Sequence, residues 1–281
     1  MDKGILYLVA TPIGNLDDIT VRALNTLKTV DMIACEDTRH SLKLFNHFDI
    51  AKPLTSYHEH NKQEKGEYLV QKLLDGENIA LVTDAGTPAI SDPGEDLVKR
   101  CIENGIRVVP VPGAVALVNA LIISGQNTQR FSFEGFLSVN RKNRFEHLTS
   151  VADDERTLIF YEAPHKLLRT LGDMLEIFGD RSISIVKEIT KIHENCSKTT
   201  LSEAIAYFEQ TPPKGEYVLI VSGKNRQQAI DEQRAEVMSM SVKEHVDMLI
   251  GTGLGKKEAI KEAAIQRGVP KRDVYNEYNE F

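Results

Sequence analysis

Cysteine is scarce in this chain. Its three cysteines, Cys35, Cys101 and Cys196, are far apart and odd in number among 281 residues. Their spacing matches neither a metal-ligand motif nor a disulfide framework, which favours a reducing, cytoplasmic environment. The histidine cluster His58-Glu59-His60 has no third ligand nearby. The sequence therefore predicts no metal site.

Long apolar runs are also missing. The run that opens the chain, Ile5–Ala10, is six residues long and ends at Thr11-Pro12. Such a run is too short for a signal-peptide core or a membrane-spanning helix, so no membrane association is expected. The net charge of −7 argues against a general nucleic-acid binder, which usually presents a basic face. It leaves room for local basic patches.

In the first half, short β-rich runs alternate with amphipathic stretches. The predicted strands are Ile5–Ala10, Met32–Cys35, Pro53–Tyr57, Ile79–Thr83 and Arg107–Val111. The predicted helices are Ile19–Leu27, Ser41–Phe48, Glu67–Leu74 and Asp96–Glu103. This alternation predicts βαβ units and a mainly parallel sheet. Ligands bind beyond the carboxyl ends of the strands in such sheets, so the loops after strands are the expected site.

The second half predicts two further units. An apolar helix, Ala114–Ser124, leads into strands at Arg130–Leu137, Thr157–Tyr161, Ser182–Val186 and Glu216–Val221. Helices are predicted at Asn143–Val151, His165–Phe178 and Ser202–Phe208. The polar stretch Lys224–Arg234 is typical of a linker, and three short helices follow at Val242–Ile250, Lys256–Arg267 and Lys271–Tyr278. We therefore expect α/β domains over 1–112 and 113–224, with a ligand cleft between them, and a small helical domain over 225–281.

One loop is unusually rich in glycine and proline. The segment Val82–Gly94 follows an apolar strand and precedes a helix. Gly86 and Gly94 permit backbone conformations closed to other residues, while Pro88 and Pro93 stiffen the chain. This composition indicates a loop that presents backbone groups to a ligand beside Asp84, Ser91 and Asp92, although a purely structural connection is the alternative.

The loop after the first strand carries no phosphate-binding motif. The segment Ala10–Asp18 matches neither G-x-G-x-x-G nor G-x-x-x-x-G-K-[ST]. The usual sequence signatures of dinucleotide binding and of nucleoside-triphosphate binding are therefore missing from this loop. Asp17 and Asp18, at the start of the next helix, would repel an anion. A cofactor without phosphates fits better. S-adenosyl-L-methionine is such a cofactor, with an adenosine, an amino acid and a sulfonium cation.

Several short motifs together match one family in order and spacing. They are Ala10-Thr-Pro-Ile-Gly-Asn-Leu16, Glu36-Asp-Thr-Arg39, Thr83–Gly94, Pro112-Gly-Ala114, Tyr161-Glu-Ala-Pro-His165, Lys187-Glu-Ile-Thr190 and Lys214-Gly-Glu216. From about residue 4 to about residue 223, the chain resembles the ribosomal RNA small subunit methyltransferase I family of the tetrapyrrole methylase superfamily. Two departures are visible: Lys187 stands where the family more often has arginine, and the first loop lacks the glycine-rich form of the small-molecule tetrapyrrole methylases.

The resemblance implies a two-domain α/β fold of the tetrapyrrole-methylase type (class III methyltransferase) with a small C-terminal helical domain. It also implies a homodimer and S-adenosyl-L-methionine in the cleft between the α/β domains. The implied reaction is 2′-O-methylation of a cytidine in the decoding-centre region of bacterial 16S rRNA, within the small ribosomal subunit. The alternatives are a methyltransferase of the same fold that acts on a small molecule such as a precorrin, and a non-catalytic RNA- or ribosome-binding protein.

The expected cofactor contacts follow from the same motifs. Asp84 is expected to accept a hydrogen bond from the cofactor's amino group; the alternative is a turn residue that bonds its own backbone. Close packing, core aromatics and plain turns are the alternatives for the other positions. The full set is Pro12, Gly14, Asp84, Gly86, Thr87, Pro88, Ala89, Ser91, Gly113, Ala114, Ala116, Phe160, Tyr161, Gly215, Glu216 and Tyr217.

A ribose 2′-hydroxyl is a very weak acid, so a nearby carboxylate or lysine would help to remove its proton. A sulfonium leaves without protonation, and positioning is therefore expected to supply most of the rate. The candidates for the proton acceptor lie near predicted strand ends, and the sequence does not choose among them. They are Glu36, Asp37, Glu162, Lys187 and Glu188.

Phosphate neutralisation supplies most of the affinity for RNA, so positive charge is needed somewhere. One basic run is Arg141-Lys142-Asn143-Arg144. The C-terminal tail carries a local charge of +4 between Gly255 and Arg272, with helix–turn–helix spacing. A solvated helix face is the alternative for both. The expected RNA contacts are Arg39, Arg141, Lys142, Arg144, Lys256, Lys257, Lys261, Lys271 and Arg272.

Overall fold

The structure is a computed structural model that describes residues 2–225 and 237–279. Most of the predicted linker, Lys224–Arg234, lies outside the described residues. The chain divides into two compact units, Met1–Ser222 and Gly223–Phe281. The first unit contains two five-stranded sheets, and the described part of the second contains helices and no strand. The boundary expected near residue 113, between the two sheets, stays a prediction.

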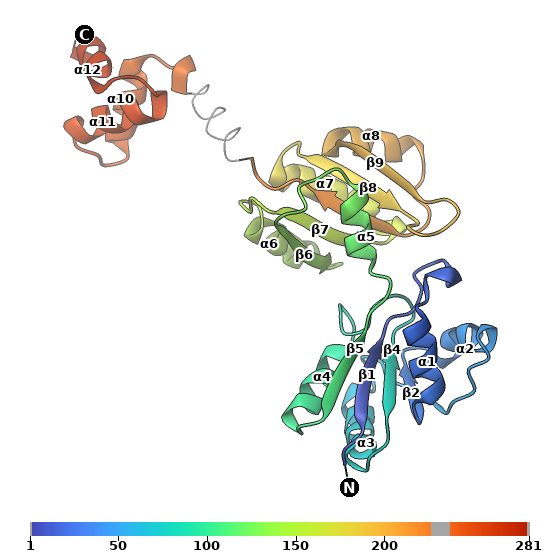
Figure 1. Ribbon diagram of the computed structural model, residues 1–281. Coiled ribbons are helices and arrows are strands. Elements are labelled where there is room, and N and C mark those ends of the chain that lie inside the picture. The colour runs from blue at the N-terminus through green and yellow to red at the C-terminus, as the bar shows by residue number, and fades with distance from the viewer. Residues whose placement is uncertain (1, 226–236, 280–281) are drawn as a thin grey trace. The chain divides into compact units, whose positions relative to one another are not determined.

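The first sheet is wholly parallel, with strand order β3-β2-β4-β1-β5 (Figure 1). Its strands are β1 (Ile5–Val9), β2 (Met32–Cys35), β3 (Leu54–Ser56), β4 (Ile79–Val82) and β5 (Arg107–Val111). Its helices are η1 (Leu16–Asp18), α1 (Val21–Thr29), α2 (Thr38–His47), α3 (Lys62–Leu74) and α4 (Gly94–Glu103). The βαβ order predicted from the sequence is confirmed.

Helices cover both faces of this sheet because its strands are apolar on both sides. In β4, Ile79 and Leu81 pack in a cluster with side chains of α3 and α4. Ala80 and Val82 point the other way and pack in a cluster with side chains of α1 and α2. Successive side chains of a strand point to opposite faces, and a strand buried on both faces reads as a continuous apolar run. The carboxyl ends of the strands are thus the positions left free to build a site.

The second sheet is mixed, with order β6-β7-β10-β8-β9. The pair β6–β7 is parallel, and the pairs β7–β10, β10–β8 and β8–β9 are antiparallel. Its strands are β6 (Phe131–Phe136), β7 (Thr157–Glu162), β8 (Ser182–Lys187), β9 (Asn195–Thr200) and β10 (Tyr217–Val221). Its helices are α5 (Ala116–Ile123), α6 (Arg141–Ser150), η2 (Pro164–Lys166), α7 (Leu167–Phe178) and α8 (Leu201–Gln210).

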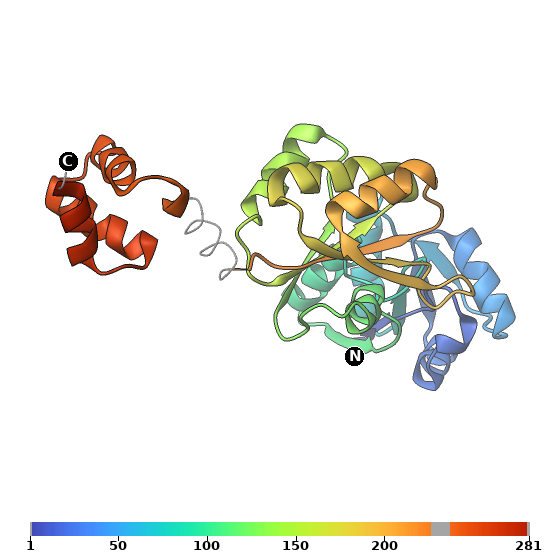
Figure 2. The ribbon, with the colours of Figure 1, turned by 90° about the horizontal axis from the view of Figure 1, so that it is seen from above.

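The two faces of the second sheet have separate cores. Helix α5 packs on one face, where Ile159, Val218 and Ile220 join its cluster. Helices α6, α7 and α8 pack on the other face, where Phe160 and Leu219 join theirs (Figure 2). Because residues of a strand alternate between faces, neighbouring residues of β7 have different surroundings.

The second unit is built on α10 (Val242–Gly251), α11 (Lys256–Arg267) and α12 (Lys271–Asn279). A capping box of Ser241 and Glu244 starts α10, and Gly268 ends α11 in the left-handed conformation, with φ of 67°. These three helices share a small core. Together with the sheets and the comparisons below, this appendage confirms the predicted fold class.

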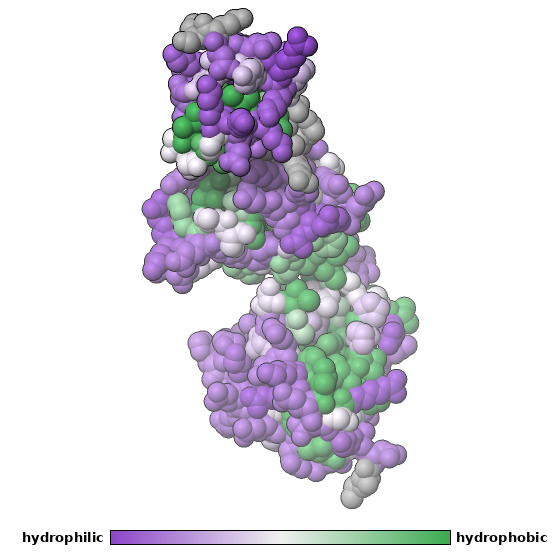
Figure 3. Space-filling view, turned by 90° about the vertical axis from the view of Figure 1, so that its left-hand side faces the viewer, coloured by the Kyte–Doolittle hydropathy of each residue, from purple (hydrophilic) through white to green (hydrophobic). Residues whose placement is uncertain are grey.

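Apolar side chains also reach the surface, and on the face drawn in Figure 3 they gather in patches between hydrophilic ones. Within residues 2–225 and 237–279, no helix combines the length and apolar character needed to cross a bilayer. The same residues contain no group of three or more histidine, cysteine, aspartate or glutamate side chains that could hold a metal ion.

Candidate active site

A cleft of about 1010 Å³ lies in the first unit. One wall consists of loops that follow strands of the first sheet, including Ile13, Glu36, Thr83, residues 85–87 and residues 90–93. The other wall comes from the second sheet and includes Phe136, residues 161–165 and Glu216. Its size is that of pockets that hold drug-sized molecules. It opens at the carboxyl ends predicted to build the site.

The glycine-rich loop after β4 is held in an unusual conformation. Gly86 forms a two-way backbone bridge to Thr11, with N···O distances of 2.9 and 3.1 Å. Ala89 and Ser91 have positive φ angles of 68° and 62°, which cost about 1–3 kcal/mol each in residues other than glycine. The Asp92 carboxylate stabilises the turn by accepting from the N–H groups of Ala89 at 2.9 Å and Gly94 at 2.7 Å. Strain of this kind clusters at ligand-binding loops.

Asp92 was not among the predicted contacts, although it lies in the loop that the sequence singled out. It lines the cleft directly. Burial raises the pKa of this carboxyl, and the hydrogen bonds from backbone N–H groups only partly offset that effect. The sequence signal was present in the Ser-Asp-Pro-Gly pattern, since aspartate often accepts from the backbone of the turn that contains it.

The cleft is acidic. Among the described residues that line it there is neither lysine nor arginine. Its carboxylates are Glu36, Glu59, Asp92, Glu95, Glu162 and Glu216. Burial raises the pKa of Glu36, and the nearby Asp84 and Asp92 carboxylates raise it further. Lysines outside the lining pair with two of the lining carboxylates, Lys62 with Glu59 at 2.6 Å and Lys191 with Glu216 at 2.7 Å. The carboxylates that remain, such as Glu36 and Asp92, disfavour a phosphate and favour a cation.

An aromatic group flanks the same cleft. The Tyr161 ring lies 4.9 Å from that of Phe133 and 5.5 Å from that of Phe136, measured between centroids. The Tyr161 hydroxyl accepts from the Leu117 N–H at 3.0 Å, which fixes the ring against the start of α5. Phe136 lines the cleft with more than half of its surface exposed, and the sequence analysis did not select it.

Phe160 requires a correction. Its side chain has no exposed surface and belongs to the core beneath α6, α7 and α8. Tyr161, the next residue of β7, faces the cleft instead. Both were predicted cofactor contacts, with a core aromatic as the alternative, but alternation along a strand sends them to opposite faces of the sheet. Phe160 is therefore a core residue and cannot stack on a ligand in the cleft.

A network of side chains holds the loop before β10. Glu188 has a positive φ of 52° and accepts from the Glu216 N–H at 2.9 Å. The Lys191 ammonium bridges Glu188 at 3.1 Å and Glu216 at 2.7 Å. Gly215 has a φ of 87°, and a Cβ there would lie 2.6 Å from the Glu188 carboxylate. Only glycine fits this position, because both the backbone and the space exclude a side chain.

The structure brings some of the predicted cofactor contacts together in the cleft and leaves others behind it. Those that line it are Gly86, Thr87, Ser91, Ala116, Tyr161, Glu216 and Tyr217. Those outside its lining, besides Phe160, are Pro12, Gly14, Asp84, Pro88, Ala89, Gly113, Ala114 and Gly215.

Several residues of the second group act as supports. Asp84 accepts from the Asp37 N–H at 3.2 Å. The Ala114 carbonyl accepts from the Thr87 hydroxyl at 3.1 Å. A Cβ on Gly113 would lie 2.8 Å from that of Ala10, so this glycine allows close packing of two loops.

The predicted proton acceptors differ in position. Glu36 and Glu162 line the cleft, whereas Asp37, Lys187 and Glu188 do not. Asp37 is the N-cap of α2 and forms an ion pair with Arg39 at 3.0 Å. Hydrogen bonding to Arg39 lowers the pKa of Asp37 to about 2.

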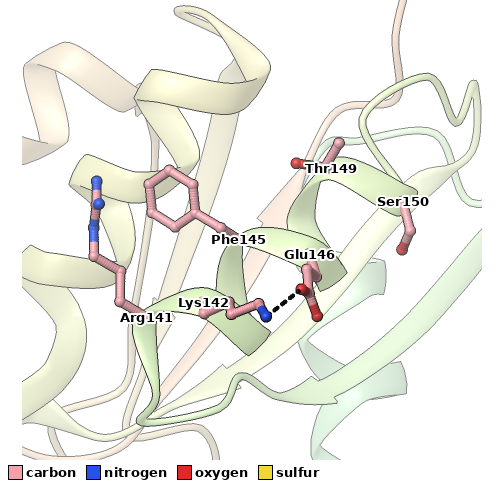
Figure 4. A pocket seen from close by; sticks show the side chains of 6 residues that line it. All are labelled: Arg141, Lys142, Phe145, Glu146, Thr149 and Ser150. Carbon is pink, nitrogen blue, oxygen red and sulfur yellow. Dashed lines mark ion pairs between the residues drawn. The ribbon is translucent and has the colours of Figure 1, made fainter.

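Two of the three expected RNA contacts on α6, Arg141 and Lys142, line a surface hollow of about 620 Å³ together with Phe145 (Figure 4). Both cations already have acidic neighbours. Arg141 lies 3.3 Å from Glu176, and Lys142 lies 3.9 Å from Glu146. The Arg141 guanidinium also stacks on the Phe145 ring, 4.1 Å from its centroid. Nearby acids thus offset the positive charge of this hollow.

Arg144 requires a second correction. Only 1% of its surface is exposed, and its Nε donates to Asp173 at 2.5 Å. Its Nη1 donates to the carbonyls of Ser138 and Val139. All these contacts are internal, so the side chain is not available to an RNA phosphate.

The other expected RNA contacts are on the surface. The Arg39 side chain is 90% exposed. In the second unit all five predicted contacts are exposed on α11 and α12, namely Lys256, Lys257, Lys261, Lys271 and Arg272.

Comparisons with known proteins fit this geometry. Residues 5–205 match the family model of tetrapyrrole (corrin/porphyrin) methylases. The chain is 52% identical to a protein of Halalkalibacterium halodurans named ribosomal RNA small subunit methyltransferase I, over 99% of this chain and 96% of that one. A Bacillus subtilis protein of the same name is 49% identical, over 99% and 95%.

Solved structures share the fold at low sequence identity. A crystal structure of diphthine synthase has a TM-score of 0.61 at 14% identity and covers 79% of this chain and 91% of its own. Uroporphyrin-III-C-methyltransferase from Thermus thermophilus has a TM-score of 0.56 at 17% identity and covers 78% and 94%. At these identities the likeness concerns the fold alone.

Proposed function

This chain belongs to the tetrapyrrole methylase family, in the group of ribosomal RNA small subunit methyltransferase I, and on that premise we propose the reaction that it performs. The proposed reaction is transfer of the methyl group of S-adenosyl-L-methionine to the ribose 2′-oxygen of a cytidine, in the decoding-centre region of 16S rRNA. We also propose a cytoplasmic location, because a ribosomal substrate would be found there.

The acidic, phosphate-excluding cleft is the observation that carries this proposal. Its carboxylates, without lysine or arginine among the described lining, suit a cofactor that has a sulfonium and no phosphate. When bound, S-adenosyl-L-methionine supplies a methyl group activated by the positive charge on sulfur. The residues that would hold it are Gly86, Thr87 and Ser91 on one wall, and Tyr161, Glu216 and Tyr217 on the other.

The chain's own contribution is mainly positioning. The strained turn at Ala89 and Ser91, held by Asp92, fixes the orientation of the backbone groups on one wall before any ligand arrives. The Glu188–Lys191–Glu216 network fixes the loop on the other wall. Preorganised walls hold two reactants in line without losing entropy at the moment of reaction, which supplies several kcal/mol of rate acceleration in well-oriented reactions.

The second unit is the better candidate for the contact with RNA phosphates. Its five predicted basic residues are exposed on α11 and α12, whereas Arg144 is buried and Arg141 and Lys142 have acidic partners. The turn between α11 and α12 also keeps the helix–turn–helix spacing expected from the sequence. The acidic lining of the cleft disfavours phosphate, so we infer that the exposed basic residues of α11 and α12 contact the RNA backbone.

The decisive experiment is transfer of labelled methyl from S-adenosyl-L-methionine to small ribosomal subunits isolated from a strain that lacks this protein. Mapping of the label should locate it on a ribose 2′-oxygen of a single cytidine. Label on a base, or on a purified tetrapyrrole with none on subunits, would refute the proposal. The homodimer stays a prediction, which the mass of the native protein in solution would test.

A further inference from the structure

We propose that Glu36 is the group that takes the proton from the ribose 2′-hydroxyl during methyl transfer. This inference rests on the proposed function and deepens it. The sequence offered five candidates of equal standing. The structure distinguishes them by two properties that a proton acceptor must have: a place in the cleft, and an oxygen or nitrogen not already committed to the protein.

Three candidates fail the first criterion. Asp37 lies outside the cleft lining, and both of its oxygens accept from Arg39, at 2.8 Å from the backbone N–H and 3.0 Å from the guanidinium. Glu188 is also outside the lining, and its Oε1 accepts from both Glu216 and Lys191. Lys187, at the end of β8, is not a lining residue either.

Glu162 fails the second criterion. It lines the cleft, but only 3% of its surface is exposed. Its Oε1 accepts from the Ala163 N–H at 2.8 Å, and its Oε2 accepts from the Thr170 hydroxyl at 2.6 Å. Both oxygens therefore already accept hydrogen bonds, from the segment that connects β7 to α7 and from α7 itself. A proton on this carboxyl would break contacts that shape the wall.

Glu36 satisfies both criteria. It directly follows β2, is exposed, and lines the cleft opposite the wall formed by the second sheet. Its one hydrogen bond among the described residues is a long one, 3.5 Å from the Thr83 hydroxyl to Oε2. The other oxygen is available to a substrate hydroxyl. Among the five candidates, Glu36 is thus the cleft carboxylate that can accept a proton without losing a short hydrogen bond to the protein.

The surroundings of Glu36 also make it a better base. Although the residue is exposed as a whole, partial burial of its carboxyl group and the nearby carboxylates of Asp84 and Asp92 raise its pKa, and the bond from Thr83 and the nearby His58 lower it by less. A general base works best when its pKa lies close to the operating pH, provided that it is still ionised there. The titratable groups around it come from several elements: Asp84 after β4, Asp92 and Glu95 before and in α4, and His58 and Glu59 after β3.

The proposed step balances without any further reactant. A bond forms between the ribose 2′-oxygen and the methyl carbon, while the bond from that carbon to sulfur breaks and its electron pair stays on sulfur. The 2′-hydroxyl proton moves to a Glu36 oxygen and is later released to water. The products are the 2′-O-methyl ribose, a neutral thioether and one proton.

The test is single-turnover methyl transfer to small subunits by Glu36→Gln, which keeps the shape of the side chain and removes its basicity. We expect the rate to fall by about 10²- to 10⁴-fold, with the affinity for S-adenosyl-L-methionine, measured by calorimetry, changed by less than about threefold. In the wild type the rate should rise with pH and level off as Glu36 ionises, with a midpoint above the ordinary glutamate value of about 4.3. That ionisation should be missing from the variant's profile.

Asp37→Asn is the matched control, because it neutralises the neighbouring carboxylate. Asparagine caps a helix as well as aspartate does, so α2 should remain intact. Its rate should stay within about threefold of the wild type. A Glu36→Gln variant with a wild-type rate, or with an unchanged pH profile, would overturn the assignment of Glu36 while leaving the proposed function standing. Absence of transfer by the wild-type protein would instead refute the proposed function itself.

Discussion

Replacing Arg144 by alanine should destabilise the first unit strongly, although the residue belongs to a basic run that looks like a surface patch in the sequence. The Arg144 guanidinium is 1% exposed and is bound to Asp173 at 2.5 Å. Its Nη1 also donates to the Ser138 carbonyl at 2.8 Å and the Val139 carbonyl at 3.2 Å. Alanine removes all three contacts at once.

The expected loss is about 3–5 kcal/mol of unfolding free energy, because the Asp173 carboxylate stays buried without its main partner. The closest remaining cation, Arg141, has its Nε 3.9 Å from that carboxylate, too far to replace a hydrogen bond. In a unit of this size each kcal/mol corresponds to about 2–4 °C, so the melting temperature should fall by about 6–20 °C.

Thermal and urea unfolding followed by circular dichroism would measure this loss. Arg141→Ala, one turn earlier on α6, is the matched control. The Arg141 side chain is 67% exposed, so its loss should change the unfolding free energy by no more than about 1 kcal/mol. The double variant Arg144→Met/Asp173→Leu should recover much of the loss, because an apolar pair leaves no buried charge. Equal, small effects of Arg144→Ala and Arg141→Ala would refute the reasoning.

Three further predictions concern the cleft and the basic face. Gly86→Ala should weaken S-adenosyl-L-methionine binding in calorimetry, because its φ of 87° strains any other residue. Gly172→Ala, in open space within α7, should leave binding unchanged and stabilise slightly. The pKa of Glu188 is lowered, because burial raises it but the bonds from Glu216 and Lys191 outweigh that effect. Its contribution to stability is therefore present above pH ~4.3 and lost in more acid solution. Melting temperatures of wild type and Glu188→Gln should differ at pH 7 and converge as the pH falls through the lowered pKa of Glu188; a constant difference would contradict this. The double variant Lys257→Gln/Lys261→Gln should weaken binding to small subunits. It should also reduce the slope of log affinity against log salt concentration by about 1 per lysine. An unchanged slope would show that these two lysines do not contact RNA phosphates.

The sequence was most informative where one physical rule dominated. The first sheet was predictable because each strand is a short apolar run between turn signals, and burial on both faces requires that pattern. Strand β9, Asn195–Thr200, was missed. It is a polar, largely exposed edge strand that pairs with β8 alone. No apolar periodicity marks such a strand, because its position depends on a partner from elsewhere in the chain.

Helix starts show the same limit. Helix α3 begins at Lys62, five residues before the predicted start at Glu67. Its first turn, Lys-Gln-Glu-Lys, is polar and carries no apolar period. Helix α2 begins at Thr38 because Asp37 caps it, three residues before the predicted start at Ser41.

The roles of neighbouring site residues depended on tertiary contacts. Arg141 and Arg144 stand three apart on one helix, yet one is on the surface and the other is sealed against Asp173 of α7. Nothing near Arg144 in the sequence identifies that partner. For Phe160 and Tyr161 the strand period shows that they face opposite ways. Which face is open was decided by the packing of α5 and of helices α6 to α8.

The acidity of the cleft constrains how an RNA substrate can enter it. Each phosphate brought close to the carboxylates of Glu36, Asp92 and Glu95 would meet like charge. A nucleotide can therefore present its sugar to the cleft only if its phosphates are held elsewhere. The net charge of −7, which argued against a general nucleic-acid binder, then becomes a source of selectivity. Such a chain gains affinity only where the substrate satisfies an exposed cationic face and an acidic cleft at the same time.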